Sequence, residues 1–317
     1  MAELTGGVEE PLVSVGIPTY NRPRQLRAAL ETIAAQTHHN LEIIVSDNAS
    51  TDPEVAEVLG EFSRKDHRVR CIRQAENQGV LANFAYVLEI ARGNYFMWAA
   101  DDDLREPWFV ERCIALLQKY PAAAATAEVQ YICEGQPMPF FPQGTAFYEY
   151  IPRPADAALL HAIDNNFDNL IYSMFRRDAI LLNGKCIWVD VASGAGNEIP
   201  AILYAALRGG FVVLPDIGFH KVASRATYLQ ARWEEDGGEI PESSRIRGYR
   251  QALSTYAYHS AAWREIRRGV DQLPLGWRSR VRIKWRALRN LHVHFLEMLL
   301  GRKPPRRQAM PVAGYGS

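Results

Sequence analysis

The chain has 317 residues, 48% of them hydrophobic and 23% charged, and its formal net charge is zero. These values are ordinary for a globular protein, and the length allows one large α/β domain or two smaller ones. The four cysteines are far apart and form no C-x-x-C pair, which argues against a disulfide framework or a zinc site. Because no apolar run approaches the length of a bilayer span and the first ten residues lack an apolar signal core, we expect a cytoplasmic protein.

The first 130 residues alternate between strand and helix patterns. Apolar runs predict four strands, at residues 13–17, 41–45, 69–72 and 95–100. Amphipathic patterns predict the intervening helices, from about Pro23, from about Pro53 and over residues 79–91. This βαβαβαβ order predicts a mostly parallel sheet with right-handed crossovers. Ligands of such sheets bind outside the carboxyl ends of the strands.

The second half of the chain is less regular. Residues 134–155 are rich in Pro, Gly and aromatic side chains, which indicates an ordered loop or hairpin. Strand patterns occur at residues 170–175 and again at 211–214, where the pattern stops before a proline. Residues 198–208 have a helical pattern, and the acidic stretch 234–241 predicts a mobile loop.

Three consecutive aspartates, Asp101, Asp102 and Asp103, directly follow the predicted strand at residues 95–100. Adjacent carboxylates repel one another and must be solvated, neutralised by a cation or partly protonated. Hard oxygen ligands at the carboxyl end of an α/β strand suit Mg²⁺ or Mn²⁺ carrying a phosphorylated ligand. The alternative is the solvated start of a helix near Pro107, and we expect that role for Asp103.

Polar segments also follow the first two predicted strands, at residues 18–22 and 46–52. Because the strands are parallel, we expect these segments and the aspartates to meet at one edge of the sheet. A pocket there would combine an aromatic ring, a carboxylate and an amide that can read a base edge, and carboxylates that hold a metal. This combination suits a nucleoside diphosphate. A glycine-rich phosphate loop is missing from the sequence, so the phosphates would rely on the metal.

Three stretches, Val13–Arg22, Leu41–Asp52 and Ala91–Tyr95 with the aspartates that follow, resemble the family 2 glycosyltransferases. The resemblance is strong over residues 11–120 and looser to about residue 225. It implies an inverting enzyme with the GT-A fold, a Rossmann-like, mostly parallel mixed sheet flanked by helices. It also implies a nucleotide-sugar donor and Mn²⁺ or Mg²⁺ as the cofactor.

The resemblance implies roles for individual positions in this sequence. Asp47 and Asn48 stand where the family usually carries two aspartates, one of which reads the uracil or thymine edge. The amide of Asn48 departs from that pattern, although it can both donate and accept hydrogen bonds. By position in the family's motifs, the residues expected to bind the nucleotide sugar are Pro18, Thr19, Tyr20, Arg22, Asp47, Asn48 and Asp101.

Asp102 matches the metal-binding aspartate of the family's Asp-x-Asp element. The usual first aspartate of that element falls on Ala100, so Asp101 can stand in for it, and which two carboxylates touch the metal stays open. His220 lies where some GT-A enzymes place a third metal ligand. The alternative is a structural histidine, which is the commoner case for a single residue of this type.

Inverting transfer requires a carboxylate that removes the proton of the acceptor hydroxyl. Family members often carry Glu-Asp at the start of a helix that corresponds to residues 198–208, and the aligned pair here is Glu198-Ile199. Glu198 is therefore the first candidate for the base. Asp190, which ends another strand-like segment, is the second. The alternative for Glu198 is a favourable interaction with the helix dipole.

The C-terminal region is basic. Residues 242–317 carry 16 Lys or Arg and 4 Asp or Glu, whereas the rest of the chain carries 20 and 32. Residues 278–300 predict a basic amphipathic helix that either contacts an anionic membrane, on its inner face, or packs on the acidic body of the protein. Nucleic acid is not favoured as a partner, because no recognition motif accompanies the charge.

These patterns divide the chain into five parts. We expect a nucleotide-sugar-binding half and an acceptor-binding half of one GT-A domain, then a basic helical extension, with disordered ends. The expected function is metal-assisted transfer of a sugar from a UDP or dTDP donor to a glycan or lipid-linked saccharide. The alternatives are a non-catalytic nucleotide-sugar-binding protein and a nucleotidyltransferase. In chain order the five parts are residues 1–10 (disordered), 11–130 (nucleotide-sugar-binding half), 131–232 (acceptor-binding half), 233–301 (basic helical extension) and 302–317 (disordered).

Overall fold

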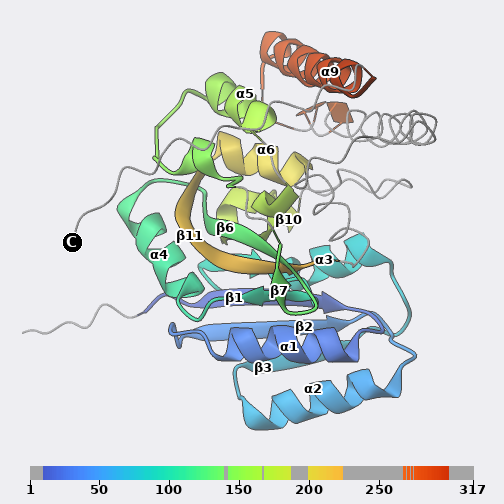
Figure 1. The fold of residues 1–317 in the computed structure, drawn as a ribbon. Helices are drawn as coiled ribbons and strands as arrows, with labels where there is room; N and C mark the ends of the chain where they lie inside the picture. The colour runs from blue at the N-terminus through green and yellow to red at the C-terminus, as the bar shows by residue number, and fades with distance from the viewer. Residues whose placement is uncertain are drawn as a thin grey trace, which may run out of the picture.

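A computed structural model gives the fold of the chain (Figure 1). It describes residues 10–138, 142–165, 168–186 and 199–223, and residues 267–299 apart from 269, 272 and 274. Within these residues a nine-stranded sheet has the order β3-β2-β1-β4-β8-β6-β11-β5, with β7 paired to β6. No helix in the described part of the chain is both long enough and apolar enough to cross a bilayer.

The first half of the sheet is parallel, as the sequence predicts. Its strands are β1 (Val13–Thr19), β2 (Leu41–Asp47), β3 (Val69–Arg73) and β4 (Tyr95–Trp98). Every residue of β1 and β2 is buried, which is typical of parallel strands covered on both faces. The connecting helices are α1 (Pro23–Ala34), α2 (Pro53–Lys65) and α3 (Val80–Glu89).

Short sequence signals set the ends of these elements. Pro23 and Pro53 are the first residues of α1 and α2, where their missing N–H groups cost nothing. The Asp52 side chain caps α2 by accepting a hydrogen bond from the Glu54 N–H at 3.0 Å. The predicted end of the first strand at Pro18 was wrong, since β1 continues to Thr19. Pro18 pairs with β2 on one side. On its other side the pairing of β1 with β4 has already ended at Gly16, so the proline interrupts no pairing with β4.

The second half of the sheet is mixed. Strand β8 (Met174–Arg176) runs antiparallel between β4 and β6 (Ala124–Cys133), and β11 (Phe211–Val222) runs parallel to β6. The predicted strand at residues 211–214 is therefore too short. Its pairing shifts register around Pro215, so a bulge takes in the proline and the strand continues to Val222.

Two other sequence predictions also differ from the structure. Asp103 does not start a helix: it begins β5 (Asp103–Arg105), which pairs antiparallel with β11, and α4 (Phe109–Lys119) starts six residues later. The predicted strand at residues 170–175 is instead a 3₁₀ turn, η2 (Asp168–Tyr172), followed by the short β8. In both cases the outcome is set by pairing with strands far away in the sequence.

The remaining helices cover the second half of the sheet. In Figure 1, α2 lies below β3 and α1 lies in front of β2 and β3, whereas α5 (Ala155–Asn165) and α6 (Ile199–Leu207) lie above β11, with α9 (Trp277–Leu299) outermost. The hydrophobic core forms two clusters of buried side chains. The smaller elements are β7 (Gln136–Pro137), η1 (Thr145–Phe147), η3 (Arg177–Ile180), β9 (Leu181–Leu182) and β10 (Lys185–Cys186).

Candidate active site

The carboxyl ends of β1, β2 and the segment after β4 meet at one edge of the sheet. The Thr19 hydroxyl donates a 2.7 Å hydrogen bond to the Asp101 carboxylate, and the Asn48 N–H donates to the Thr19 carbonyl at 3.0 Å. Thr19 also pairs with Asp47 in the parallel register of β1 and β2. Thr19 therefore joins the three polar segments that the sequence predicts to lie together.

Arg22 brings positive charge to the aspartates. Its guanidinium donates to the Asp101 carboxylate at 3.2 Å and to the Asp102 carboxylate at 2.8 Å. Burial raises the pKa of Asp101, although the Thr19 hydrogen bond and the Arg22 charge act in the opposite direction. Burial alone would lower the pKa of Arg22, but the charges of Asp101 and Asp102 outweigh it and raise that pKa. Burial thus disfavours the charged form of Asp101, and the Arg22 cation compensates part of that cost.

Asp103 lies deeper than its two neighbours. Only 2% of its surface is exposed, and neither carboxylate oxygen has a hydrogen-bond partner among the described residues. Burial raises the pKa of Asp103 to about 6, against the opposing charges of Arg105 and Lys221. Burial likewise lowers the pKa of Arg105 to about 10, and its guanidinium carbon lies 3.5 Å from the centre of the Phe219 ring. The sequence did not reveal this buried charge cluster, because Lys221 lies opposite Asp103 only through the pairing of β11 with β5.

Asp47 and Asn48 are both buried, and their polar atoms are engaged. Asp47 accepts from the Ser50 N–H at 2.9 Å and from the Arg73 guanidinium at 3.0 Å. The Asn48 amide nitrogen donates to the Asn77 side chain at 2.9 Å and to a backbone carbonyl at 3.2 Å. These contacts fix the loop after β2 and the loop before α3. Arg73 and Asn77 were missed by sequence reasoning, since neither lies in a motif.

Tyr20 and Arg22 lie at the open side of this edge, while Pro18 is part of β1. Tyr20 is 41% exposed, as a ring that stacks on a base would need to be. The turn between them contains Asn21, whose φ of 55° is left-handed. The Asn21 side-chain oxygen accepts the N–H groups of Thr51 and Asp52, at 2.8 and 3.0 Å. The turn after β1 is therefore tied to the loop after β2.

The expected metal ligands differ in their surroundings. Asp101 and Asp102 present hard oxygen atoms at the sheet edge, and Mg²⁺ is commonly bound by one or two carboxylates together with substrate phosphates. This donor set fits such a cation. His220 contacts the Glu106 carboxylate through Nε2 at 2.8 Å and pairs with Leu104 in the sheet. Among the described residues, no cluster of three or more His, Cys, Asp or Glu side chains forms a metal site of its own. The candidate bases Glu198 and Asp190 lie outside the described residues.

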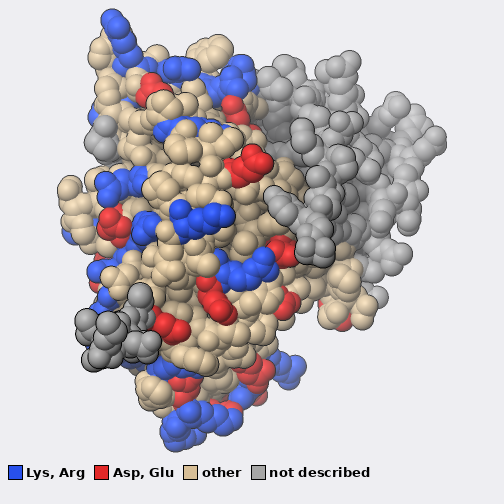
Figure 2. Space-filling model, turned by 90° about the vertical axis from the view of Figure 1, so that its left-hand side faces the viewer, with Lys and Arg blue, Asp and Glu red and all other residues tan. Residues whose placement is uncertain are grey.

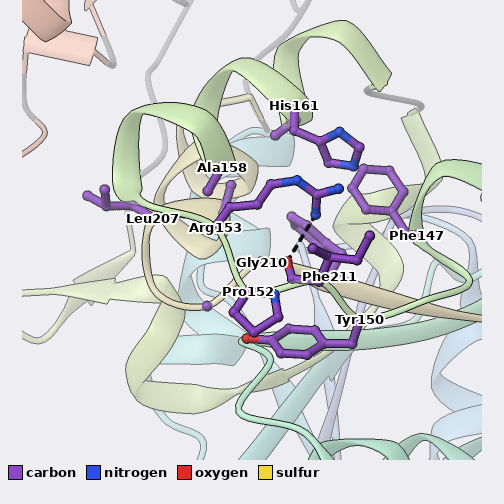
Figure 3. Close-up of a pocket in the computed structure, with 13 residues that line it drawn as sticks. Phe147, Tyr150, Pro152, Arg153, Ala158, His161, Leu207, Gly210 and Phe211 are labelled. Carbon is purple, nitrogen blue, oxygen red and sulfur yellow. Dashed lines mark hydrogen bonds between the residues drawn. The ribbon is translucent and has the colours of Figure 1, made fainter.

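A separate small pocket lies between α5, α6 and the start of β11 (Figure 3). Its volume is about 110 Å³, and Arg153 lies inside it beside Phe147 and His161. Pockets for ligands the size of a drug molecule have volumes of roughly 300–1,000 Å³. Phe211 in its wall pairs with Ala124 at the amino end of β6, so this pocket lies at the other end of the sheet from the aspartates.

Comparison with known proteins gives relatives in sequence and in structure. Glycosyltransferase GlyA of Streptococcus pneumoniae serotype 4 is 34% identical over 140 residues, which make up 44% of this chain and 20% of that protein. The chain matches only 12% to 33% of the length of the first three curated relatives.

Solved structures that share the fold include two with a bound nucleotide sugar. One is S. aureus TarS 1-349 in complex with UDP-GlcNAc, with a TM-score of 0.63 and 17% identity over 89% of this chain and 73% of that chain. The other is the mannosyltransferase PcManGT from Pyrobaculum calidifontis in complex with GDP-Man and Mn²⁺, with a TM-score of 0.55 and 17% identity over 92% and 73% of the two chains. At this identity the likeness concerns the fold, and it confirms the GT-A architecture.

The family assignment rests on more than half of the chain. The sequence model for glycosyl transferase family 2 matches residues 14–180, which include the strand ends, the aspartates and β8. Its match agrees with the resemblance seen in residues 11–120. The chain therefore belongs to glycosyl transferase family 2.

Proposed function

We propose that the chain transfers a sugar, with inversion, from a nucleoside-diphosphate donor to a hydroxyl group of an acceptor. The observation that carries this proposal is the cluster of Thr19, Arg22, Asp101 and Asp102 at the carboxyl edge of the sheet. Its carboxylates suit a divalent cation, and its guanidinium suits a diphosphate. The nucleotide sugars bound to the two structures of the same fold support this choice of donor.

Different residues at this edge would bind different parts of the donor. Tyr20 offers an exposed ring for the base or ribose, and Asp47 and Asn48 are buried at the end of β2 on the same edge. Arg22 can turn from the aspartates toward the diphosphate, because its side chain is half exposed. Asp102, with Asp101, would hold Mn²⁺ or Mg²⁺. When bound, the cation offsets the charge that develops on the departing nucleotide.

The acceptor proton requires a base on the opposite side of the donor sugar. Glu198 remains the first candidate and Asp190 the second, both from their positions in the sequence. Replacing Glu198 with Gln is expected to abolish transfer and to leave donor binding intact. Continued turnover by that variant would eliminate Glu198 and leave Asp190 to be tested in the same way.

UDP or dTDP donors, and a glycan or lipid-linked saccharide of an envelope or polysaccharide pathway as the acceptor, follow from the family resemblance. A thermal-shift screen of UDP, dTDP and GDP sugars, each with Mn²⁺ or with a chelator, tests the donor. We expect a UDP or dTDP sugar to raise the melting temperature only when Mn²⁺ is present. The same shift with the chelator, or no shift with any sugar, would contradict the proposal.

Donor hydrolysis separates the proposed enzyme from the alternatives. A metal-dependent release of UDP or dTDP from the donor identifies a transferase, whereas binding without release indicates a non-catalytic binding protein. A nucleotidyltransferase would instead release pyrophosphate from a nucleoside triphosphate and a sugar phosphate. The sequence around Gly16 to Thr19 lacks the basic, glycine-rich loop which that reaction uses, so we expect no pyrophosphate.

A further inference from the structure

Helix α9 docks on the body of the protein through one face. Ile283 and Ala287 are buried on this face, which packs against α5. The Arg286 guanidinium donates two hydrogen bonds to the Asp164 carboxylate, at 2.8 and 2.6 Å, and Ser279 donates to Asp156 at 2.9 Å. Both acceptors belong to α5. The predicted packing of the basic helix on acidic residues of the same chain is therefore present on this face of α9.

The opposite face of α9 is apolar and open to solvent. Trp277, Val281 and Trp285 are 71%, 57% and 63% exposed. They are spaced four residues apart, so they form one stripe along the helix. At 100° per residue, this stripe lies about 190° around the helix from the docked face. We call it the tryptophan face. Exposing two tryptophans on one stripe of a helix is unusual unless the surface has a partner.

Positive charge borders the tryptophan face. Arg278, Arg282 and Arg289 are exposed and follow the stripe along one side. The Arg278 guanidinium lies 5.5 Å from the Trp277 ring centre. In Figure 2, Lys and Arg side chains gather at the top of the molecule, at the height where Figure 1 shows α9. Glu297 is the one acidic residue in the sequence of α9, against six Lys and Arg residues, so the positive charge is not balanced within the helix.

We propose that the tryptophan face of α9 lies on the surface of an anionic membrane. Tryptophan favours the boundary between headgroups and acyl chains, and arginines beside it can reach lipid phosphates. The six Lys and Arg residues between positions 278 and 289 keep the helix at the surface and prevent it from crossing the bilayer. A protein partner would need an acidic groove of matching length, whereas an anionic bilayer offers both the apolar layer and the charge. The proposal is independent of the transfer reaction.

Co-sedimentation of the full chain with vesicles tests this proposal. Vesicles of phosphatidylcholine alone are compared with vesicles that also contain phosphatidylglycerol. We expect binding to the mixed vesicles, weak binding to the neutral ones, and loss of binding as salt is added. A chain that ignores the mixed vesicles, or that binds both kinds equally, overturns the proposal.

Two variants test which residues make the contact. Each arginine near an anionic surface increases the affinity for the membrane roughly fivefold. The triple variant Arg278→Gln, Arg282→Gln, Arg289→Gln is therefore expected to bind the mixed vesicles about a hundredfold more weakly. The double variant Trp277→Ser, Trp285→Ser should also lose binding, even at low salt.

A matched control removes the same amount of charge elsewhere on the surface. The variant Arg64→Gln, Lys119→Gln, Lys185→Gln changes three exposed cations outside α9 and should bind like the unmodified chain. Circular dichroism and urea unfolding of all variants show whether each one still folds. Equal loss of binding in the control, or full binding by both α9 variants, would show that general charge or another surface is responsible.

Discussion

The Arg22 guanidinium lies 2.8 Å from the carboxylate of Asp102. A side-chain cation thus occupies an oxygen that the proposed metal would use, and it also contacts Asp101 at 3.2 Å. Because 51% of the Arg22 side chain is exposed, this pairing is screened by solvent and can be exchanged at little cost. If Asp101 and Asp102 hold the proposed divalent cation, Arg22 would compete with it for these carboxylates until a diphosphate gave the guanidinium another partner.

The first prediction concerns this competition. In Arg22→Ala, Mn²⁺ alone should bind up to about fivefold more tightly, since an exposed ion pair contributes about 0.2–1 kcal/mol. UDP in the presence of saturating Mn²⁺ should bind more weakly, because a diphosphate contact is lost. Isothermal titration with Mn²⁺, and then with UDP, measures both changes. Arg24→Ala, a neighbouring exposed arginine, is the control; opposite changes in the two affinities would be hard to obtain from a general loss of structure.

The second prediction concerns Asp102 itself. Asp102→Ala should remove the Mn²⁺-dependent rise in melting temperature that UDP produces, while the melting temperature without ligand changes little. Asp178→Ala removes an exposed carboxylate that pairs with Arg208, away from the proposed site, and should keep the effect of UDP. If UDP still stabilises the Asp102 variant in a metal-dependent way, another residue holds the cation.

The sequence predicted the elements whose signals are local. The buried runs of β1, β2 and β4, and the helix starts at Pro23 and Pro53, follow from residues close together in the chain. Parallel order then placed Thr19 near the aspartates. The site could be predicted to this extent because all three segments follow strands of one repeated βα pattern.

What could not be predicted depends on distant partners. Asp103 has the sequence context of a helix start, but pairing with β11, more than a hundred residues later, makes it part of a strand. The family resemblance predicts that Asp47 or Asn48 reads a base edge, and the structure shows in addition that the Asn48 amide donates to the Asn77 side chain. Likewise, the contact between Arg286 and Asp164 distinguishes the two faces of α9, and the sequence of the helix alone does not. Composition gave the charge of that helix, and packing decided which side remained exposed.

The third prediction concerns the buried hydrogen bond between Thr19 and Asp101. Thr19→Val keeps the shape of the side chain and removes the donor, which should lower the free energy of unfolding by about 1–3 kcal/mol at pH 8. The folded pKa of Asp101 is already raised, mainly by burial, and the Thr19 bond opposes that rise. The folded state of the variant therefore favours the protonated carboxyl further. The loss in unfolding free energy caused by Thr19→Val should therefore grow as the pH rises through the folded pKa of Asp101 and shrink at acid pH.

Urea unfolding at several pH values measures this deficit. Thr37→Val is a matched control, since the Thr37 hydroxyl also donates to a carboxylate, that of Glu111 at 2.6 Å, but in an exposed setting. We expect only a small change in the control. A Thr19 variant whose deficit is constant with pH would show that the lost hydrogen bond acts through packing and not through the charge of Asp101.

The last prediction concerns the amino edge of the sheet, where Glu42 of β2 joins β1 to the loop before β4. Its carboxylate accepts from the Ser14 hydroxyl at 2.7 Å, and from the Arg92 N–H and guanidinium at 3.0 and 2.8 Å. Burial would raise the pKa of Glu42, but these hydrogen bonds outweigh it and lower that pKa. The charged form is therefore favoured by folding, which is the reverse of the situation at Asp101. Glu42→Gln places an amide group against donors and should cost about 1–3 kcal/mol at pH 7.

Because the folded pKa of Glu42 is lowered, the stability it contributes is present above its unfolded pKa and is lost as the pH falls through the folded pKa. The difference in unfolding free energy between the unmodified chain and Glu42→Gln should thus shrink toward acid pH. The deficit of Thr19→Val has the same pH trend. In the unmodified protein, however, ionisation of Glu42 favours folding, whereas ionisation of Asp101 opposes it. Glu57→Gln, on the exposed side of α2, should follow the unmodified chain at every pH. A Glu42 deficit that persists undiminished in acid would mean that its hydrogen-bond geometry, and not its charge, stabilises this edge.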